Sequence, residues 1–140
     1  MLLFEVRKFT QSSYKKMRNP AKIYLVDHGL ARKVSSENLE RILENIVYIQ
    51  LRRKRYDIHY FEEEGRECDF IAFNGQALEA YQVAWELTDG NKRREIEGLL
   101  VASNCTEAQK LTILTRDQEG TTNVEGKKIE ILPAWKWLVV

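Results

Sequence analysis

The chain has 140 residues, 44% of them hydrophobic and 31% charged, with seven glycines and two prolines, which predicts one folded domain over residues 1–140 and excludes a disordered chain. Lys and Arg number 22 against 21 for Asp and Glu, so the net charge of +1 creates no overall field that would attract a polyanion. Two cysteines, Cys68 and Cys105, are too few for a disulfide framework, and the lack of a signal peptide or membrane span predicts a cytoplasmic protein.

The first third of the sequence contains two short apolar runs and one long amphipathic stretch. Residues 2–6 and 22–26 are predicted strands, and a polar helix over residues 10–18 lies between them and ends before a proline. A longer helix begins at Ser35 or Ser36, either of which can cap it. Its apolar stripe recurs at intervals of three and four residues and consists of Leu39, Ile42, Leu43, Ile46 and Val47.

The rest of the sequence alternates predicted strands with two further helices. The strands are expected at residues 58–61, 68–73, 77–87, 111–115 and 129–132. One helix is expected over residues 91–102, and a short one follows Pro133, where only one of Trp135 and Trp137 can face inward. Because helices are interspersed among strands, we expect an α/β fold with a mixed central sheet flanked by helices.

A predicted hairpin brings polar side chains together. Asn74-Gly75 is typical of a two-residue turn, which would pair residues whose numbers add up to 149. Asp69 would then face Ala80 and be a diagonal neighbour of Gln82, with their Cα atoms roughly 7–8 Å apart. Since side chains alternate along a strand, Asp69, Gln82 and Ala84 are expected on one face of the hairpin, and the other face is expected to be core.

This polar face resembles a phosphate-handling site that lacks one group. An acidic residue and a carboxamide, followed by a lysine two residues after the carboxamide, would suit a divalent cation and a phosphate. Ala84 occupies the position of that lysine. Half-exposed polar residues without a chemical role are the alternative explanation. A bulge would instead bring Glu79 and Tyr81 to this face, and it would expose apolar side chains there.

Several segments together resemble one prokaryotic family. They read NPAKIYLVDHGL at residues 19–30, LENIVY at 43–48, ECDFI at 67–71, YQVAWEL at 81–87, and KKI through PAWKWL at 127–138. In this order they are similar to the uncharacterised C-terminal domain of prokaryotic AAA-type, archaeal-like ATPases. The resemblance covers nearly all of the chain.

The resemblance implies a restriction-endonuclease-like core. In such a core a helix glutamate, a strand aspartate and a Glu-x-Lys pair on the next strand form the metal site. Glu44 matches the glutamate and Asp69 the aspartate, and these two would hold a Mg²⁺ ion. Gln82 stands in place of the Glu of the pair, and Ala84 in place of its lysine. The resemblance therefore implies a vestigial catalytic site made of Glu44, Asp69 and Gln82.

Other basic residues are candidates for the missing charge or for nucleic-acid contacts. Lys92, Arg93 and Arg94 lie at the start of the predicted helix 91–102, although a solvated helix start also accounts for them. The basic run at residues 52–55 has the same two interpretations, a phosphate contact or a complement to the negative end of a helix.

Two functions are compatible with these observations. The sequence lacks the Gly-x-x-x-x-Gly-Lys-Ser/Thr phosphate loop, so an ATPase would be a partner of this chain and not its own activity. We expect a non-catalytic or weakened nuclease-like accessory domain that binds protein or nucleic acid. The alternative is a metal-dependent DNA nuclease with a displaced catalytic lysine. Ala84 favours the accessory domain, and whether the chain is an enzyme stays open.

Overall fold

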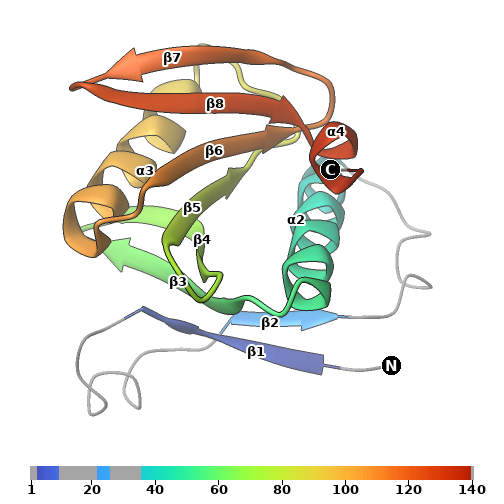
Figure 1. Ribbon diagram of the computed structural model, residues 1–140. Helices are drawn as coiled ribbons and strands as arrows, with labels where there is room; N and C mark the ends of the chain where they lie inside the picture. Colours follow the sequence, from blue (N-terminus) through green and yellow to red (C-terminus); the bar gives the residue numbers. More distant parts are fainter. Residues whose placement is uncertain (1–2, 10–21, 26–35, 140) are drawn as a thin grey trace.

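A computed structural model describes residues 3–9, 22–25 and 36–139 of the chain (Figure 1). These residues form an α/β fold, as the sequence predicts. The polar helix predicted at residues 10–18 lies outside the described residues. Within the described part of the chain, no helix has both the length and the apolar character needed to cross a membrane.

The strands of the described segments form one mixed sheet with the order β2-β1-β3-β4-β5-β6-β8-β7. Their bounds are β1 (Leu3–Lys8), β2 (Lys22–Leu25), β3 (Asp57–Glu63), β4 (Arg66–Phe73), β5 (Leu78–Val83), β6 (Lys110–Thr115), β7 (Gly120–Val124) and β8 (Lys127–Pro133). Parallel pairing joins β1 to β3, β5 to β6 and β6 to β8, and the other neighbours are antiparallel. The predicted mixed sheet is therefore confirmed.

Helices lie on both faces of this sheet. The long helix α2 (Ser36–Arg53) and the short helix α4 (Ala134–Leu138) cover one face, and α3 (Lys92–Thr106) covers the other (Figure 1). The apolar stripe of α2 contributes Leu43 and Val47 to the core, as expected. On α4, Trp137 is buried and Trp135 is 57% exposed, which confirms that only one of the two faces inward.

Both faces of the β4–β5 hairpin are packed, contrary to the expectation of a single core face. Phe70, Tyr81 and Val83 lie in the core on the α2 side. Ala80 and Ala84 lie in a second core, on the α3 side. Because α3 covers the face that was expected to be half exposed, that face is packed with apolar side chains, Ile71 among them.

The predicted two-residue turn at Asn74-Gly75 is wrong. Paired residues of β4 and β5 have numbers that add up to 151, which leaves a loop over residues 74–77. The side-chain oxygen of Asn74 accepts hydrogen bonds from the backbone N–H groups of Gln76 (2.8 Å) and Ala77 (2.9 Å), which closes the longer loop. The register shifts by two residues, so the paired side chains of β4 and β5 keep their faces but gain different partners.

Two-residue turns occur at two Glu-Gly pairs that were not predicted from the sequence. Glu64-Gly65 joins β3 to β4, and Glu125-Gly126 joins β7 to β8. All four residues have positive φ, between 50° and 78°, as a type I′ turn requires. Strand β7 was also missed, because its polar residues at the sheet edge give no hydrophobic alternation.

Candidate carboxylate and lysine site

The site is built where the backbone pairing of β4 and β5 ends. The pairing stops at Phe70 and Tyr81, and side chains continue the connection from there. The N–H of Asp69 donates to Oε1 of Gln82 (2.9 Å), and the N–H of Val83 donates to Oδ2 of Asp69 (2.8 Å). The predicted neighbours Asp69 and Gln82 are therefore brought together, as directly bonded residues and not as diagonal ones.

An irregularity on the other side of β4 accompanies this opening. His59 of β3 pairs with Ile71, whereas Phe61 pairs with Cys68, so two steps on β3 correspond to three on β4. An extra residue of this kind is a β-bulge, which redirects side chains next to it. The bulge lies at Asp69 and Phe70. The alternative in which a bulge brings Glu79 and Tyr81 to this face is wrong, because the bulge lies in the preceding strand, β4, and Tyr81 lies in the core on the α2 side.

Gln82 joins three parts of the molecule and is only 2% exposed. Besides accepting from Asp69, it donates through Nε2 to the carbonyl oxygens of Glu67 (2.7 Å) and Glu95 (3.2 Å). Both ends of its amide are thus bonded, and β4, β5 and α3 are held together. Gln82 lies in the predicted site, where it acts as a clamp between backbones.

The close approach of α3 to this clamp depends on Gly98. A Cβ atom at that position would lie 2.1 Å from the Glu67 carbonyl oxygen and 2.5 Å from Nε2 of Gln82. No real side chain tolerates such contacts, and the first is with backbone, which cannot move aside easily. Glycine at position 98 therefore lets the helix reach the sheet.

Lys22 supplies an ammonium to the site from the distant strand β2. This lysine was not predicted from the sequence as a site residue. Its Nζ forms an ion pair with Glu67 and lies 3.9 Å from Oδ1 of Asp69 and 4.0 Å from Oε1 of Glu44. The side chain passes over β3, where Nζ lies 5.0 Å from the ring centre of Tyr60. A charged residue at the start of an apolar strand, within the segment 19–30 of the resemblance, was the available clue.

Two of the carboxylates around Lys22, Glu44 and Asp69, act on each other because most of each side chain is removed from water. Burial and the nearby charge of Glu44 raise the pKa of Asp69 well above its ordinary value. The charge of Lys22 and the N–H of Val83 oppose that rise without cancelling it. Burial lowers the pKa of Lys22, but the three carboxylates raise it more, so its pKa lies above the ordinary value and the amine is charged at neutral pH.

A second layer of acidic groups consists of Glu40 of α2 and Glu95 of α3, and the charge of Glu40 acts on Glu95. Burial raises the pKa of Glu40, and the charge of Glu44 adds to that effect. Burial also raises the pKa of Glu95, whose side chain accepts a hydrogen bond from Arg94 (3.3 Å). The region is therefore short of positive charge, and Arg94 partly balances it.

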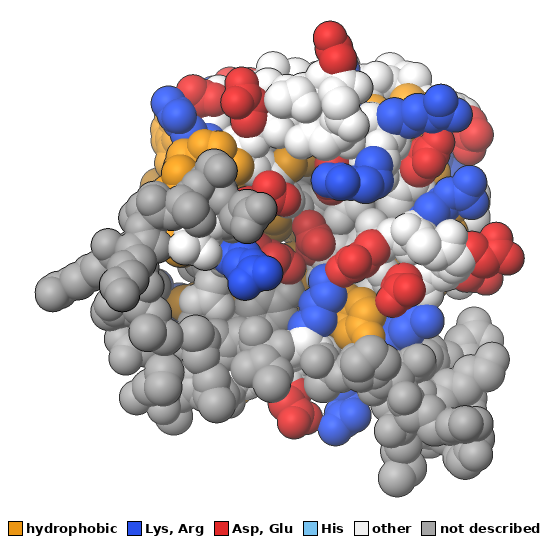
Figure 2. All heavy atoms as spheres, turned by 180° about the vertical axis from the view of Figure 1, so that it is seen from behind, with side chains coloured by type: hydrophobic (Ala, Val, Ile, Leu, Met, Phe, Trp, Pro, Cys, Tyr) orange, Lys and Arg blue, Asp and Glu red, His pale blue; other side chains and the backbone are white. Residues whose placement is uncertain are grey.

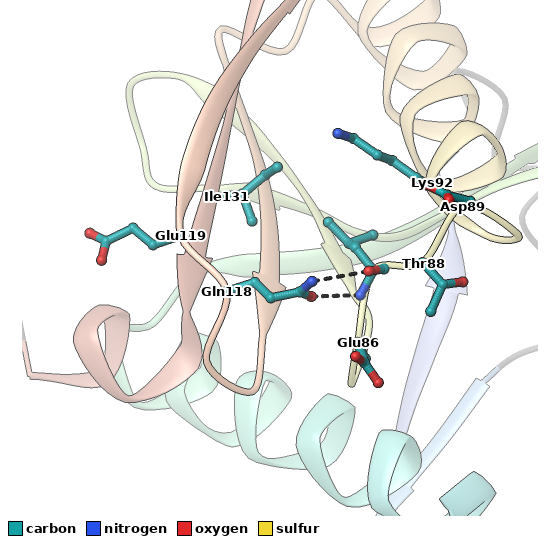
Figure 3. Close-up of a pocket in the computed structure, with 8 residues that line it drawn as sticks. Glu86, Thr88, Asp89, Lys92, Gln118, Glu119 and Ile131 are labelled. Carbon is teal, nitrogen blue, oxygen red and sulfur yellow. Dashed lines mark hydrogen bonds between the residues drawn. The ribbon is translucent and has the colours of Figure 1, made fainter.

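The three basic residues predicted to replace the lysine lie elsewhere. Arg93 pairs with Glu97 on its own helix (2.9 Å), and Arg94 pairs with Glu95. Lys92 lines a pocket of about 620 Å³ between α3 and the loop before β7, where the amide of Gln118 bonds both backbone groups of Leu87 (Figure 3). Of these three residues, Arg94 is the one that acts on the acidic layer.

Position 84 lies in the hydrophobic core. Ala84 is fully buried on the α3 side with Leu99 and Ile113, and its N–H donates to the carbonyl of Leu114 (3.0 Å). A lysine there would have no route to the ammonium position beside Asp69 without displacing core side chains. The absence of a lysine at position 84 is therefore explained by packing.

Two residues of the basic run 52–55, at the C-terminal end of α2, lie against aromatic rings. The Arg52 guanidinium lies 3.5 Å from the ring centre of Phe4, and the Lys54 ammonium 5.4 Å from that of Trp137. On the face opposite to the view of Figure 1, acidic and basic side chains alternate (Figure 2). The described surface in that view offers no continuous basic patch for a nucleic-acid backbone.

When Glu44, Glu67 and Asp69 are all ionised, these three carboxylates and one ammonium leave an excess of two negative charges around Lys22. A hard divalent cation, which prefers oxygen ligands, would balance this excess. Among the described residues, no group of three or more His, Cys, Asp or Glu side chains already has the arrangement of a metal site. Metal binding by Glu44 and Asp69 thus stays a prediction.

These observations define an α/β domain with a mixed sheet and a partly buried carboxylate and lysine cluster. An alignment of 148 positions, which covers 97% of the chain, shows 35% identity to an uncharacterised protein of Methanocaldococcus jannaschii. A second alignment of 141 positions, which covers 99% of the chain, shows 27% identity to an uncharacterised protein of Haemophilus influenzae. The chain spans 33% and 34% of these relatives, about a third of each. No known family profile and no solved structure matches the chain.

Proposed function

We propose that this chain is a nuclease-like domain with a restriction-endonuclease-like core, which binds a divalent cation and acts on nucleic-acid phosphodiesters as one part of a longer protein. One observation carries the proposal. Glu44 of α2 and Asp69 of β4 come from distant parts of the sequence, yet both lie about 4 Å from the same ammonium, Lys22, in a largely buried place. Like charges gathered away from water suit a site that takes up a cation.

The residues present fit a magnesium ion in charge and in chemistry. Glu44 and Asp69 would hold it, because both offer hard anionic oxygens. When bound, the ion would supply Lewis acidity and an activated water for phosphodiester hydrolysis. Asp69 is oriented by the N–H of Val83, and Gln82 fixes the strand that carries Asp69. The chain thus provides a rigid carboxylate whose position does not depend on a flexible loop.

The length of the relatives supports an association with further domains. The chain corresponds to about a third of each, and the resemblance of its motifs implies an AAA-type ATPase as the attached part. We propose that the ATPase is the partner and that the present domain engages the nucleic acid, in the cytoplasm. Both are proposals about the longer protein.

A non-catalytic accessory domain is the second candidate. Ala84 is packed in the core, so this chain has no lysine at the position that the resemblance assigns to one. Lys22 is also engaged by Glu67. In this alternative, the cluster is a structural ion network, and the domain binds protein or nucleic acid without cleaving it.

Calorimetric titration with Mn²⁺ and Mg²⁺ tests the proposal. We expect one binding event in the unaltered chain, and loss of it in Asp69→Asn and Glu44→Gln. Asp117→Asn, an exposed acidic residue outside the cluster, is the matched control and should bind like the unaltered chain. A chain that takes up neither ion would contradict the proposal. Cation-dependent cleavage of plasmid or single-stranded DNA that Asp69→Asn abolishes would exclude the accessory alternative.

A further inference from the structure

We infer that Lys22 of β2 is the catalytic ammonium of this domain, supplied from another strand in place of the lysine that position 84 does not carry. This inference rests on the proposed function. It assigns Lys22 to the phosphoryl group of the substrate, beside the carboxylates Glu44 and Asp69. It also changes the interpretation of Ala84. The lack of a lysine at position 84 then reflects a rearranged site, and not a site that has lost its positive charge.

The position of Lys22 among the acidic side chains supports the assignment. Its Nζ lies 3.9 Å from Asp69 and 4.0 Å from Glu44, and it pairs with Glu67. Its side chain is 27% exposed, and Glu67 is 47% exposed. The ammonium can therefore be reached from solvent, although most of its side chain is covered.

The contact with Glu67 leaves Lys22 able to change partners. Glu67 is the most exposed of the three carboxylates, so water can replace the lysine there at little cost. Asp69, in contrast, is fixed by the N–H of Val83. A phosphate oxygen that enters the cluster would find an ammonium able to turn from Glu67 toward it. Glu67 thus keeps Lys22 in place until substrate arrives.

The other nearby cation is less suitable. Arg94 acts on Glu95 and Glu40, the second layer of acidic groups, and its side chain is 75% exposed. Among the lysines and arginines of the described segments, Lys22 of β2 is the residue that lies within 4.0 Å of both Glu44 and Asp69.

The reaction assigned to this arrangement is phosphodiester hydrolysis. A water oxygen forms a new bond to phosphorus, and the bond between phosphorus and the leaving sugar oxygen breaks. One water proton ends on the leaving oxygen, giving a hydroxyl, and the other is released to solvent as the new phosphomonoester ionises. Negative charge grows on the phosphoryl oxygens during this step. Lys22 would stabilise that charge, the role of a pre-positioned cation in a site with little water.

The experiment compares Lys22→Met and Lys22→Arg with the unaltered chain. Lys110→Met, an exposed lysine at the start of β6, is the matched control. Far-UV circular dichroism first establishes that each variant is folded. Mn²⁺ binding is then measured by calorimetry, and cleavage of plasmid and single-stranded DNA is measured with Mn²⁺ present. We expect Lys22→Met to keep or tighten Mn²⁺ binding, because a competing cation is removed. Its cleavage rate should fall by about 100-fold or more through kcat, whereas Lys22→Arg should keep part of it.

Each outcome decides between the assignments. If Lys22→Met cleaves like the unaltered chain, Lys22 is not the catalytic ammonium, although the proposed function stands. If Lys22→Met is folded but no longer binds Mn²⁺, Lys22 has a structural role and the inference is wrong. If the unaltered chain binds Mn²⁺ and cleaves neither substrate, the accessory alternative replaces the proposed nuclease activity, and the inference is wrong with it. A chain that binds no Mn²⁺ overturns the proposed function itself.

Discussion

The backbone N–H of Val83 donates a hydrogen bond of 2.8 Å to the carboxylate of Asp69, where the regular pairing of β4 and β5 has ended. A strand that would otherwise pair backbone to backbone is here held by a side chain. The carboxylate gains a fixed orientation from this bond. It also lies in a largely dry environment beside Glu44, which is why the pKa of Asp69 is well above its ordinary value.

Replacement of Asp69 by Asn should change how stability depends on pH. A carboxyl with a raised pKa binds its proton more tightly in the folded state, so its contribution to stability is greatest in acid. That contribution declines as pH rises from the ordinary value of 3.8 through the raised value. Asn can still accept the Val83 bond and does not titrate. The free energy of unfolding of Asp69→Asn, relative to the unaltered chain, should therefore increase with pH in this range.

Urea denaturation between pH 4 and pH 8 measures that difference. Asp117→Asn serves as the control, because it removes a carboxylate that is 66% exposed. A difference between Asp69→Asn and the unaltered chain that stays constant with pH would contradict the buried, charge-coupled environment of Asp69.

Replacement of Gly98 by Ala should separate α3 from the sheet. The added Cβ would lie 2.1 Å from the Glu67 carbonyl oxygen, so the helix must move and the bonds of Gln82 must lengthen. We expect a loss of about 1–3 kcal/mol in the free energy of unfolding, as for other overpacked positions. Gly120→Ala is the matched control, since its Cβ would meet no atom within 4 Å. Chemical denaturation of both variants provides the measurement, and equal stability would contradict the close approach.

Replacement of Gln82 by Glu, the residue that the resemblance implies at this position, should destabilise the domain. Oε1 could still accept from Asp69, but the two bonds that Nε2 donates, to Glu67 and Glu95, would be lost. Leaving buried acceptors without a donor costs about 1–3 kcal/mol. A protonated Glu restores one donor, so the loss should be smaller in acid than at neutral pH. Gln109→Glu, at an exposed position, is the control for the added charge.

That effect can be followed by thermal unfolding at pH 4.5 and pH 7.5. A variant that is as stable as the unaltered chain at both pH values would mean that Gln82 does not clamp β4 to α3. Stronger Mn²⁺ binding by a folded Gln82→Glu chain would, in addition, place position 82 among the metal ligands.

Much of the fold could be predicted from the sequence because it depends on local patterns. The apolar stripe of α2 and the apolar runs of β2, β4 and β6 specify their own secondary structure. The two faces of β4 and β5 also followed from alternation, up to the bulge at Asp69. Of the predicted site residues, Glu44 and Asp69 lie about 4 Å from the same ammonium, and Gln82 bonds to the backbone of Asp69. The role of the three residues as ligands stays a prediction.

The position of Lys22 could not be predicted in the same way. Its neighbours Glu44 and Asp69 are 22 and 47 residues away in sequence, and they meet only after β2, β1, β3 and β4 have assembled in that order. The register of the hairpin was also out of reach, because Asn74 can support either a short turn or the longer loop. An error of two residues in the pairing of β4 and β5 leaves each paired side chain on the correct face of the sheet and changes which residues lie opposite each other.

Replacement of Ala84 by Lys tests whether the position of the missing lysine matters. If the site were merely degenerate, this variant should restore a cation beside Asp69 and increase cleavage. The structure instead places Ala84 in the fully buried core next to Leu99 and Ile113. A buried, unpaired ammonium is costly and is expected to lose its proton or to open the core. We therefore expect Ala84→Lys to lose about 3 kcal/mol or more of stability, or to fail to fold, without gaining activity.

Urea denaturation measures the stability of Ala84→Lys, and Gln109→Lys, at an exposed position, is the control that should be as stable as the unaltered chain. A stable Ala84→Lys chain with faster cleavage would show that the ammonium belongs on β5, and it would remove the reason for assigning that role to Lys22.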